Sequence, residues 1–246
     1  MRKTIKPIDI KSLQAELAGA SAEEILSKVA ELLDAAVFAT SLGQEDQVIL
    51  DLIARQGLNI PVFTLDTGRL FPETYDLIAA TEQKYGLKIQ IAFPDAAEVE
   101  QMVAEEGINL FRKSIDARKR CCGVRKMHPL KRFLGDFDGW ISGLRRDQSP
   151  TRTEMHAIEW DSGNAIPKFN PLIDWTLDDV QRHLRGNDIP CNPLHDRGFV
   201  SIGCACCTRA IQPGEDIRAG RWWWENPEQK ECGLHSRQES QPQEKI

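Results

Sequence analysis

Short apolar runs alternate with amphipathic stretches in the first half of the chain and predict strands followed by helices. The runs 35–41 and 59–67 are apolar and compatible with β-structure, and the stretches that follow them, 45–57 and 71–86, repeat apolar residues at helical spacing. A third strand is predicted at 87–93. Strands that alternate with helices of this length are typical of a parallel sheet with right-handed crossovers. The sequence therefore predicts an α/β fold.

Further elements are predicted on both sides of this region. Residues 10–34 have the pattern of two amphipathic helices, and the second begins with a capping box in which Ser21 precedes Glu24 by three residues. Another strand is predicted at 138–144, and a capped helix at 173–186. These elements lengthen the α/β pattern without changing it.

The end of the chain differs in composition from the rest. The segment ENPEQKECGLHSRQESQPQEKI contains almost no apolar side chains, so burial cannot offset the entropy lost on ordering it. We therefore expect three parts: N-terminal helices at 1–34, a main domain at 35–225 and a mobile tail at 226–246.

Composition narrows the class of protein. The first residues have no apolar leader and no run of 18 apolar residues occurs, so we expect a soluble, cytoplasmic protein without a membrane partner. The net charge of −6 argues against a nucleic-acid binder. Nine Lys or Arg nevertheless fall within residues 112–132, against the single acidic residue Asp116, and this local charge suits a small anionic ligand.

The hexapeptide SLGQED, at 41–46, follows the first predicted strand and begins its helix. At such a junction backbone N–H groups and the helix dipole favour an anion, so the hexapeptide predicts a phosphate site. It is not a Walker loop, because the GxxxxGK[ST] pattern is absent. An ordinary strand-to-helix turn is the alternative interpretation.

Two cysteine pairs suggest a metal site. The chain has seven cysteines, an odd number that does not suit a disulfide framework in a reducing compartment. Thiolates in these numbers suit structural zinc or a [4Fe–4S] cluster, and a set of buried free cysteines is the alternative. Cys206 is a rival thiol inside the second pair, and Cys191 is interpreted as a core residue. The four candidate ligands are Cys121 and Cys122 in RKRCCGVRKM, and Cys204 and Cys207 in IGCACCTRA.

A further cysteine lies in the polar tail, in KECGLH. A core cysteine has no reason to occur in a segment without a core, so Cys232 is expected to be exposed. Lys230 and His235 beside it favour the thiolate form. Cys232 is therefore either a nucleophile or a harmless exposed thiol.

The segment GEDIRAGRWWWE, at 214–225, carries two arginines three residues apart. If this segment is helical, Arg218 and Arg221 share one face and could hold an anion bidentately, although a solvated face is the alternative. Packing is the favoured interpretation of the three tryptophans, and a stacking platform is the alternative.

Together these motifs resemble a known family. SLGQED, LDTGRLFPET, KRCCGVRK, GLRRDQSPTR, IGCACCTRA, PGEDIRAGRWWWE and KECGLH resemble the assimilatory adenylyl-sulfate (APS) reductases, the iron–sulfur branch of the APS/PAPS reductase family. The resemblance extends from about residue 35 to 235. The combination of both cysteine pairs with ECGLH is specific, because the cluster-free PAPS reductases share the tail and lack the pairs.

The resemblance implies an adenine nucleotide α-hydrolase-like, Rossmann-like fold that carries one [4Fe–4S] cluster per subunit. It implies reduction of APS to sulfite and AMP in sulfate assimilation, with thioredoxin as partner and an S-sulfocysteine intermediate. The implied cluster ligands are Cys121, Cys122, Cys204 and Cys207; the implied catalytic residues are Cys232, His235 and Lys126; the implied substrate-binding residues are Ser41, Gly43, Glu45, Asp46, Leu65, Asp66, Thr67, Gly68, Gly143, Arg145, Arg218 and Arg221.

The sequence is compatible with several alternatives for the metal ligands, the activity and the oligomeric state. The family often has Pro where this chain has Cys206, which leaves both cysteine pairs intact but makes exchange of cluster ligands conceivable. PAPS reduction or dual specificity is an alternative activity, and a four-cysteine zinc protein that binds nucleotide without turnover is a more distant one. The sequence leaves the choice between a monomer and a homo-oligomer open.

Overall fold

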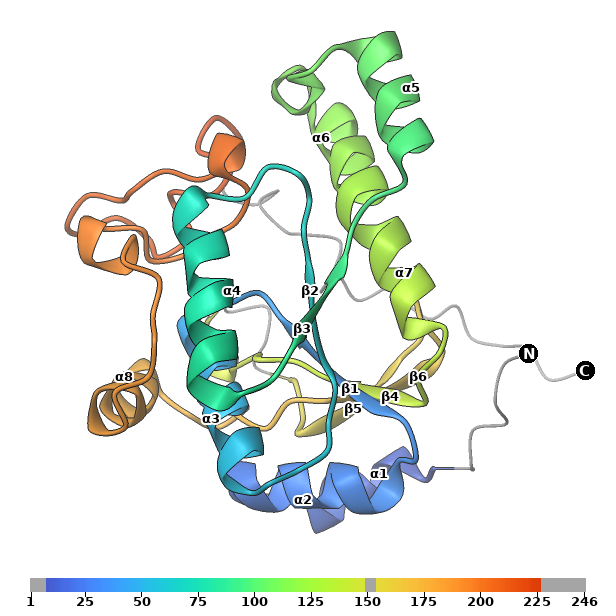
Figure 1. Cartoon of the computed structure of the whole chain (residues 1–246), viewed down its shortest axis with the longest axis vertical. Coiled ribbons are helices and arrows are strands. Elements are labelled where there is room, and N and C mark those ends of the chain that lie inside the picture. The colour runs from blue at the N-terminus through green and yellow to red at the C-terminus, as the bar shows by residue number, and fades with distance from the viewer. Residues whose placement is uncertain (1–7, 149–153, 227–246) are drawn as a thin grey trace, which may run out of the picture.

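The computed structural model of the chain describes residues 8–148 and 154–226, which form a six-stranded sheet flanked by helices (Figure 1). The strand order is β3-β2-β1-β4-β6-β5. The strands are β1 (Ala36–Thr40), β2 (Val62–Leu65), β3 (Ile89–Ala92), β4 (Gly139–Ile141), β5 (Ile158–Asp161) and β6 (Ile166–Phe169). Five of them are parallel, and β5 pairs antiparallel with β6 at one edge. The predicted α/β fold with a parallel sheet is therefore confirmed.

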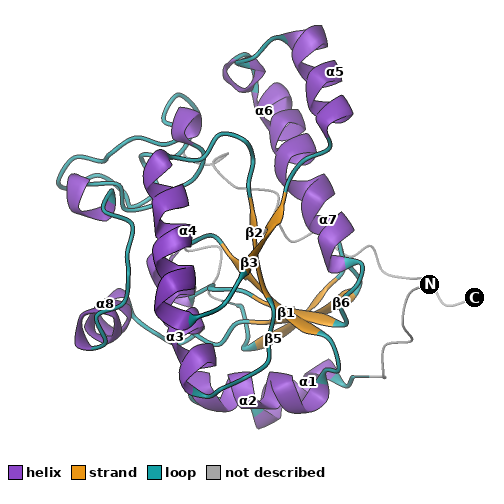
Figure 2. Cartoon of the chain, viewed as in Figure 1, coloured by secondary structure: helices purple, strands orange, loops and turns teal. Residues whose placement is uncertain are grey.

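The helices lie around this sheet (Figure 2). They are α1 (Ile10–Glu16), α2 (Ala22–Leu32), α3 (Gln44–Arg55), α4 (Pro72–Tyr85), α5 (Ala96–Glu106), α6 (Ile115–Cys122), α7 (His128–Leu134) and α8 (Leu177–Gly186). A π-helical turn, Gly123–Met127, joins α6 to α7. The capping box predicted at Ser21 is present. Among the described residues, no helix is long and apolar enough to cross a membrane.

Both faces of the sheet are covered, which explains why apolar residues dominate its central strands. Successive side chains of a strand point to opposite faces. In β1, Phe38 belongs to a core shared with α1, α2, α3, α4 and α8, whereas Val37 belongs to a core shared with α7. The helices are arranged accordingly in Figure 1, with α7 on the opposite side of the sheet from α3 and α4.

A third cluster of buried residues lies beyond the strands, where α5 and α6 extend past the sheet (Figure 1). It contains Met102, Phe111, Cys121, Cys207 and Trp222 among its members. Residues from the middle of the chain and from its later part thus share a small core of their own. This cluster surrounds the predicted cysteine site.

The order in which strands are added to the sheet reverses at β1: the chain adds β2 and β3 on one side of β1 and then β4 on the other. One carboxyl group joins the loops that follow β1 and β4. Asp46 is only 6% exposed, and its Oδ2 accepts hydrogen bonds from the Ser41 backbone N–H at 2.5 Å and the Ser41 hydroxyl at 2.7 Å. The Gly143 N–H also donates to this carboxyl group. A Cβ atom on Gly143 would lie 2.0 Å from Asp46 Oδ1, so only glycine fits there. Ligands of open α/β sheets bind at such a reversal point, beyond the carboxyl ends of the strands.

We predict that Asp46 makes stability depend on pH. Burial, more than the neighbouring Glu45 carboxylate, raises the pKa of Asp46 from 3.8 to about 7. The folded protein therefore favours the neutral acid. The stabilisation is complete below the unfolded pKa and is lost as the pH rises through the folded pKa. We expect the free energy of unfolding of the parent protein to fall, relative to that of Asp46→Asn, by up to about 4 kcal/mol between about pH 4 and pH 8.

Urea denaturation of both proteins across this pH range measures the difference. The isosteric amide keeps an oxygen that can accept both Ser41 hydrogen bonds. Parallel stability curves for the two proteins would show that Asp46 does not titrate in this range.

Candidate active site

A cleft opens beyond the carboxyl ends of β1, β2 and β4, with a volume of about 430 Å³. Its floor is formed by the loops that follow these strands, and its wall by the segments around 200–203 and 217–221. Most of the residues predicted to bind substrate line it. They are Ser41, Gly43, Glu45, Asp46, Leu65, Thr67, Gly143, Arg145, Arg218 and Arg221, together with the predicted catalytic Lys126.

Two predicted substrate-binding residues lie beside the cleft instead. Asp66 accepts hydrogen bonds from the Gly68 N–H at 2.7 Å and from the Tyr75 hydroxyl at 3.0 Å. Gly68 has φ of +70°, and a Cβ atom there would lie 3.4 Å from the Phe93 ring. Their contacts shape the loop after β2. The predicted catalytic residues Cys232 and His235 lie outside the described residues.

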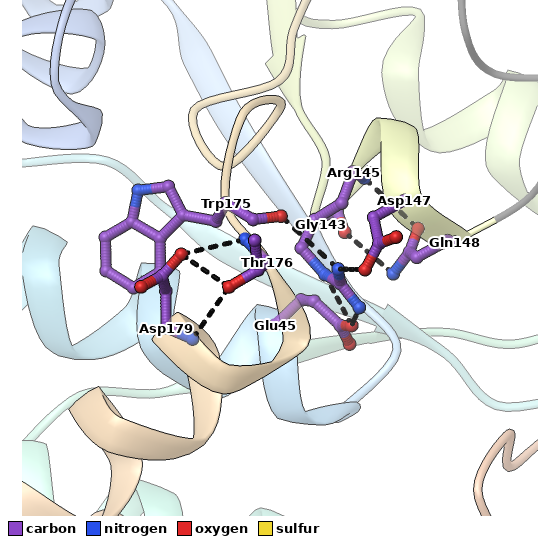
Figure 3. Close-up of polar contacts among 8 residues, drawn as sticks. All are labelled: Glu45, Gly143, Arg145, Asp147, Gln148, Trp175, Thr176 and Asp179. Carbon is purple, nitrogen blue, oxygen red and sulfur yellow. Dashed lines mark hydrogen bonds and ion pairs between the residues drawn. The ribbon is translucent and has the colours of Figure 1, made fainter.

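Arg145 lines the cleft, but its guanidinium is held by the protein itself. Its Nε and Nη2 atoms donate to the same oxygen of Glu45 at 3.0 and 2.9 Å, and Nη1 donates to Asp147 and to the Trp175 carbonyl oxygen at 3.3 Å (Figure 3). The Arg145 side chain is 4% exposed. Because the ion pair neutralises Glu45 at the N-terminus of α3, it removes a charge that would repel an anion there.

Arg221 occupies a different position. It is 8% exposed, and its Nη1 atom donates to the Ser201 hydroxyl and to the Ile202 carbonyl oxygen, both at 3.3 Å. Within residues 8–148 and 154–226, no carboxylate forms an ion pair with it, and its Nε atom has no hydrogen-bond partner. A Cβ atom on Gly203 would lie 2.4 Å from the guanidinium, so Gly203 makes room for it. Arg221 is thus a buried cation directed at the cleft.

The basic segment 112–132 is largely committed to contacts within the protein. Arg118 forms a buried bidentate ion pair with Glu225, at 3.1 and 2.9 Å. Arg120 pairs with two carboxylates at the end of α5, and Arg125 donates to the Thr67 carbonyl oxygen at 2.7 Å. Lys126, in the π-helical turn, is the cation of this segment that lines the cleft. Most of the predicted local positive charge therefore holds the fold together.

A second, smaller cavity adjoins the cleft, and five cysteines line it. These are the four predicted ligands Cys121, Cys122, Cys204 and Cys207, and in addition Cys206. The two pairs, more than 80 positions apart in the sequence, thus face one another. Lys126 and Arg221 line both this cavity and the cleft, so they separate the cysteines from the candidate substrate site.

The cysteine cavity has the donor atoms for a metal centre but is contracted. Its volume is about 20 Å³, close to the space needed for one water molecule. In the part of the chain that the structure describes, no three His, Cys, Asp or Glu side chains are arranged to hold a metal ion. Thiolates are the ligands that zinc and iron–sulfur clusters share, so the donor set fits either group. A four-iron cluster is larger than this volume.

The thiols of this cavity differ in their surroundings. Burial raises the pKa of the Cys121 thiol. The hydrogen bond with Cys207, and then the Arg69 guanidinium 3.4 Å from Sγ, lower the pKa of Cys206. Cys204 Sγ lies 3.2 Å from the Thr67 hydroxyl oxygen. Cys191 packs against the main core, as predicted.

Sequence reasoning missed two side chains at these cavities. His195 lines the cleft; its Nδ1 atom lies 2.8 Å from the Phe199 carbonyl oxygen, and its buried Nε2 atom has no partner among the described residues. Burial lowers the pKa of His195. Arg69 lies at the cysteine cavity, where no spacing rule indicates it. The polar NPLH segment before the second cysteine pair was the available signal for His195.

Comparison with known proteins gives three findings. A family model described as the phosphoadenosine phosphosulfate reductase domain matches residues 35–210. A relative in Allochromatium vinosum, named adenosine 5'-phosphosulfate reductase, is 52% identical over 89% of this chain and 86% of its own length. A protein of the same name in Burkholderia cepacia is 48% identical over 87% of this chain and 85% of its own.

Solved structures agree with this assignment. The crystal structure of phosphoadenylyl-sulfate (PAPS) reductase from Candida auris, in a phosphate complex, is 26% identical and superposes with a TM-score of 0.71, covering 82% of this chain and 98% of its own. Yeast FAD synthetase, 16% identical, superposes with a TM-score of 0.54 over 83% of this chain and 70% of its own, and shares the fold. With a family model that spans most of the described fold and relatives identical at about half of their positions, this chain belongs to the phosphoadenosine phosphosulfate reductase family.

Proposed function

We propose that this chain reduces APS to sulfite and AMP in sulfate assimilation, with thioredoxin as the electron donor. The observation that carries the proposal is the identity of about half of the aligned positions to proteins named adenosine 5'-phosphosulfate reductase, over at least 85% of both chains. The cleft at the reversal point between β1 and β4 supports it, because this is where open α/β sheets bind nucleotides.

The AMP part of the substrate fits the loops after the strands. Gly43 is the N-cap residue of α3, and within the described residues no side chain caps this helix end. The N–H groups of the first turn can therefore donate hydrogen bonds to a phosphate. Arg145 neutralises Glu45 in that turn. Asp46 and Gly143 hold the two loops at a fixed separation. These residues bind and orient the nucleotide without taking part in a chemical step.

The phosphosulfate group fits the part of the cleft that is lined by cations. Lys126, Arg218 and Arg221 line the cleft, and Lys126 and Arg221 also line the cysteine cavity. Their charges would neutralise the sulfuryl oxygens and the phosphate that leaves, and charge-assisted hydrogen bonds to a developing anion are the strongest that side chains make. His235 is proposed to join them from outside the described residues.

The reaction proceeds through the thiol of Cys232. Its thiolate attacks the sulfur of the sulfuryl group, the S–O bond to the phosphate breaks, and AMP leaves with that electron pair. A thiolate of thioredoxin then attacks the Cys232 sulfur of the S-sulfocysteine, and sulfite leaves with the electrons of the broken S–S bond. The second thioredoxin thiol closes a disulfide and releases Cys232. Two electrons pass from the dithiol to the sulfuryl group.

Cys121, Cys122, Cys204 and Cys207 would hold a [4Fe–4S] cluster in the cavity that they line. When bound, the cluster supplies charge and rigidity beside Lys126 and Arg221. A zinc ion on four thiolates is the alternative, because the donor set fits both. PAPS is the alternative substrate, favoured by the likeness to the Candida auris enzyme. A cytoplasmic location, the thioredoxin partner, and the choice between monomer and homo-oligomer stay predictions.

We expect steady turnover with APS and reduced thioredoxin, and much slower turnover with PAPS. The same protein, assayed side by side with both nucleotides for sulfite release, tests this. Equal rates would establish dual specificity, and faster PAPS reduction would contradict the proposal.

Without thioredoxin, APS should add the mass of one sulfite, about 80 Da, to the chain, as expected for a covalent thiol intermediate. Cys232→Ser should lose the adduct and turnover, while Cys191→Ser, altered in the main core, should keep both.

We predict that alanine at Lys126, Arg218 or Arg221 lowers kcat/KM for APS by about ten- to a hundred-fold or more, because each removes a charge-assisted contact. Steady-state kinetics measure the loss. Arg120→Ala is the matched control: Arg120 belongs to the same basic part of the chain but pairs with Glu105 and Glu106, away from the cleft. Kinetics unchanged in all three variants would place the anion elsewhere.

We predict that anaerobically purified protein contains about four iron and four sulfide per chain, as a cubane requires. Iron and acid-labile sulfide analyses measure both, together with a brown colour that zinc cannot give. Stoichiometric zinc without sulfide would support the zinc alternative instead.

A further inference from the structure

The cysteine cavity contains one thiol more than a four-ligand metal centre uses. Cys206 lines it together with the four predicted ligands. A [4Fe–4S] cluster takes four protein thiolates, one for each iron. Either Cys206 has no role toward the cluster, or it shares an iron position with another cysteine.

The geometry points to the second possibility and identifies the partner. Cys206 Sγ lies 3.7 Å from Cys207 Sγ. Two sulfur ligands on one tetrahedral ion, each at about 2.3 Å, lie about 3.8 Å apart. The two thiols are therefore placed to reach the same metal position.

The backbone allows either residue to supply the sulfur. Both belong to one tight turn, in which the Cys207 N–H donates to the Cys204 carbonyl oxygen at 2.9 Å. The turn is anchored by the Ala205 N–H, which donates to the Arg69 carbonyl oxygen at 2.8 Å, and by the Thr208 hydroxyl, which donates to the Cys204 carbonyl oxygen at 3.0 Å. A ligand change between neighbouring residues of this turn needs side-chain rotation and leaves both anchors in place.

Cys204 has no such substitute. The contact of its sulfur is with the Thr67 hydroxyl, at 3.2 Å, whereas the sulfur of Cys206 contacts that of Cys207. Arg69 lies against Cys206 and would also stand beside a metal-bound sulfur at that position. The fifth thiol therefore backs up one ligand of the set.

We propose that Cys206 is an alternative cluster ligand that takes the iron position of Cys207 when Cys207 is lost. The inference rests on the cluster of the proposed function. It concerns only metal retention, so APS turnover by the parent protein is judged separately.

The test compares iron and sulfide content in full-length variants reconstituted without oxygen. Cys206→Ala should keep about four iron per chain, and Cys207→Ala at least about half of the parent's iron, because Cys206 replaces the lost thiolate. The double variant Cys206→Ala/Cys207→Ala should hold about five-fold less iron than Cys207→Ala. Cys204→Ala, the matched control without a neighbouring substitute, should resemble the double variant.

Iron as low in Cys207→Ala as in the double variant would overturn the proposal, and so would iron lost from Cys206→Ala but kept by Cys207→Ala, which would make Cys206 the principal ligand. Circular dichroism shows whether each variant folds. Alkylation with iodoacetamide, mapped by mass spectrometry, gives an independent readout. Cys206 should be alkylated in the loaded parent and protected in loaded Cys207→Ala, and equal labelling of Cys206 in the two proteins would also overturn the proposal.

Discussion

The buried carboxyl group of Asp46 is the contact on which the candidate active site depends. The sheet itself only brings the ends of β1 and β4 to the same edge. It is Asp46, bonded to Ser41 and to the Gly143 N–H, that sets how far apart the two following loops stand. In the loop after β1, Leu42 has φ of +61°, a left-handed conformation that an L residue rarely adopts unless its surroundings hold it there. The loop is therefore held in shape before any ligand arrives.

A second constraint acts on the cysteine cavity. The two cysteine pairs lie outside the strands of the sheet. The buried Arg118–Glu225 ion pair joins the helix that carries Cys121 and Cys122 to the segment that follows Cys204 and Cys207. Arg118 also lies 4.6 Å from the centre of the Trp222 ring, so α6 is fixed to the segment that carries Arg221. Removing one partner of a buried ion pair leaves an uncompensated charge in the interior, so the pair resists separation of the two segments. The arrangement that it holds is the one in which the thiols line one cavity.

How much of this was visible in the sequence depended on how each contact is made. The first four strands could be predicted because apolar residues dominate them, whereas β5 and β6 contain Glu159, Pro167 and Lys168, which hide the strand pattern. The helix α6 was missed because its charged residues obscure the periodicity, and the ion-pair partner of its buried Arg118, Glu225, lies 107 positions away in the sequence.

The candidate site shows the same division. Local motifs indicated the phosphate loop and both cysteine pairs, since their spacing is itself the signal. That Arg145 is used to neutralise Glu45, 100 positions earlier, could not be read from either motif. The position of Cys206 against Cys207 depends on side-chain rotation within one turn, which spacing does not specify.

The shared wall of the two cavities has a consequence for energetics. Because Lys126 and Arg221 face the cleft on one side and the thiols on the other, any anionic group on either side draws on the same two charges. Occupants of the two cavities are then thermodynamically coupled, and the coupling is reciprocal: whatever one occupant does to the affinity of the other, the other does equally in return. A filled cleft and a filled cysteine cavity are therefore not independent states of this protein.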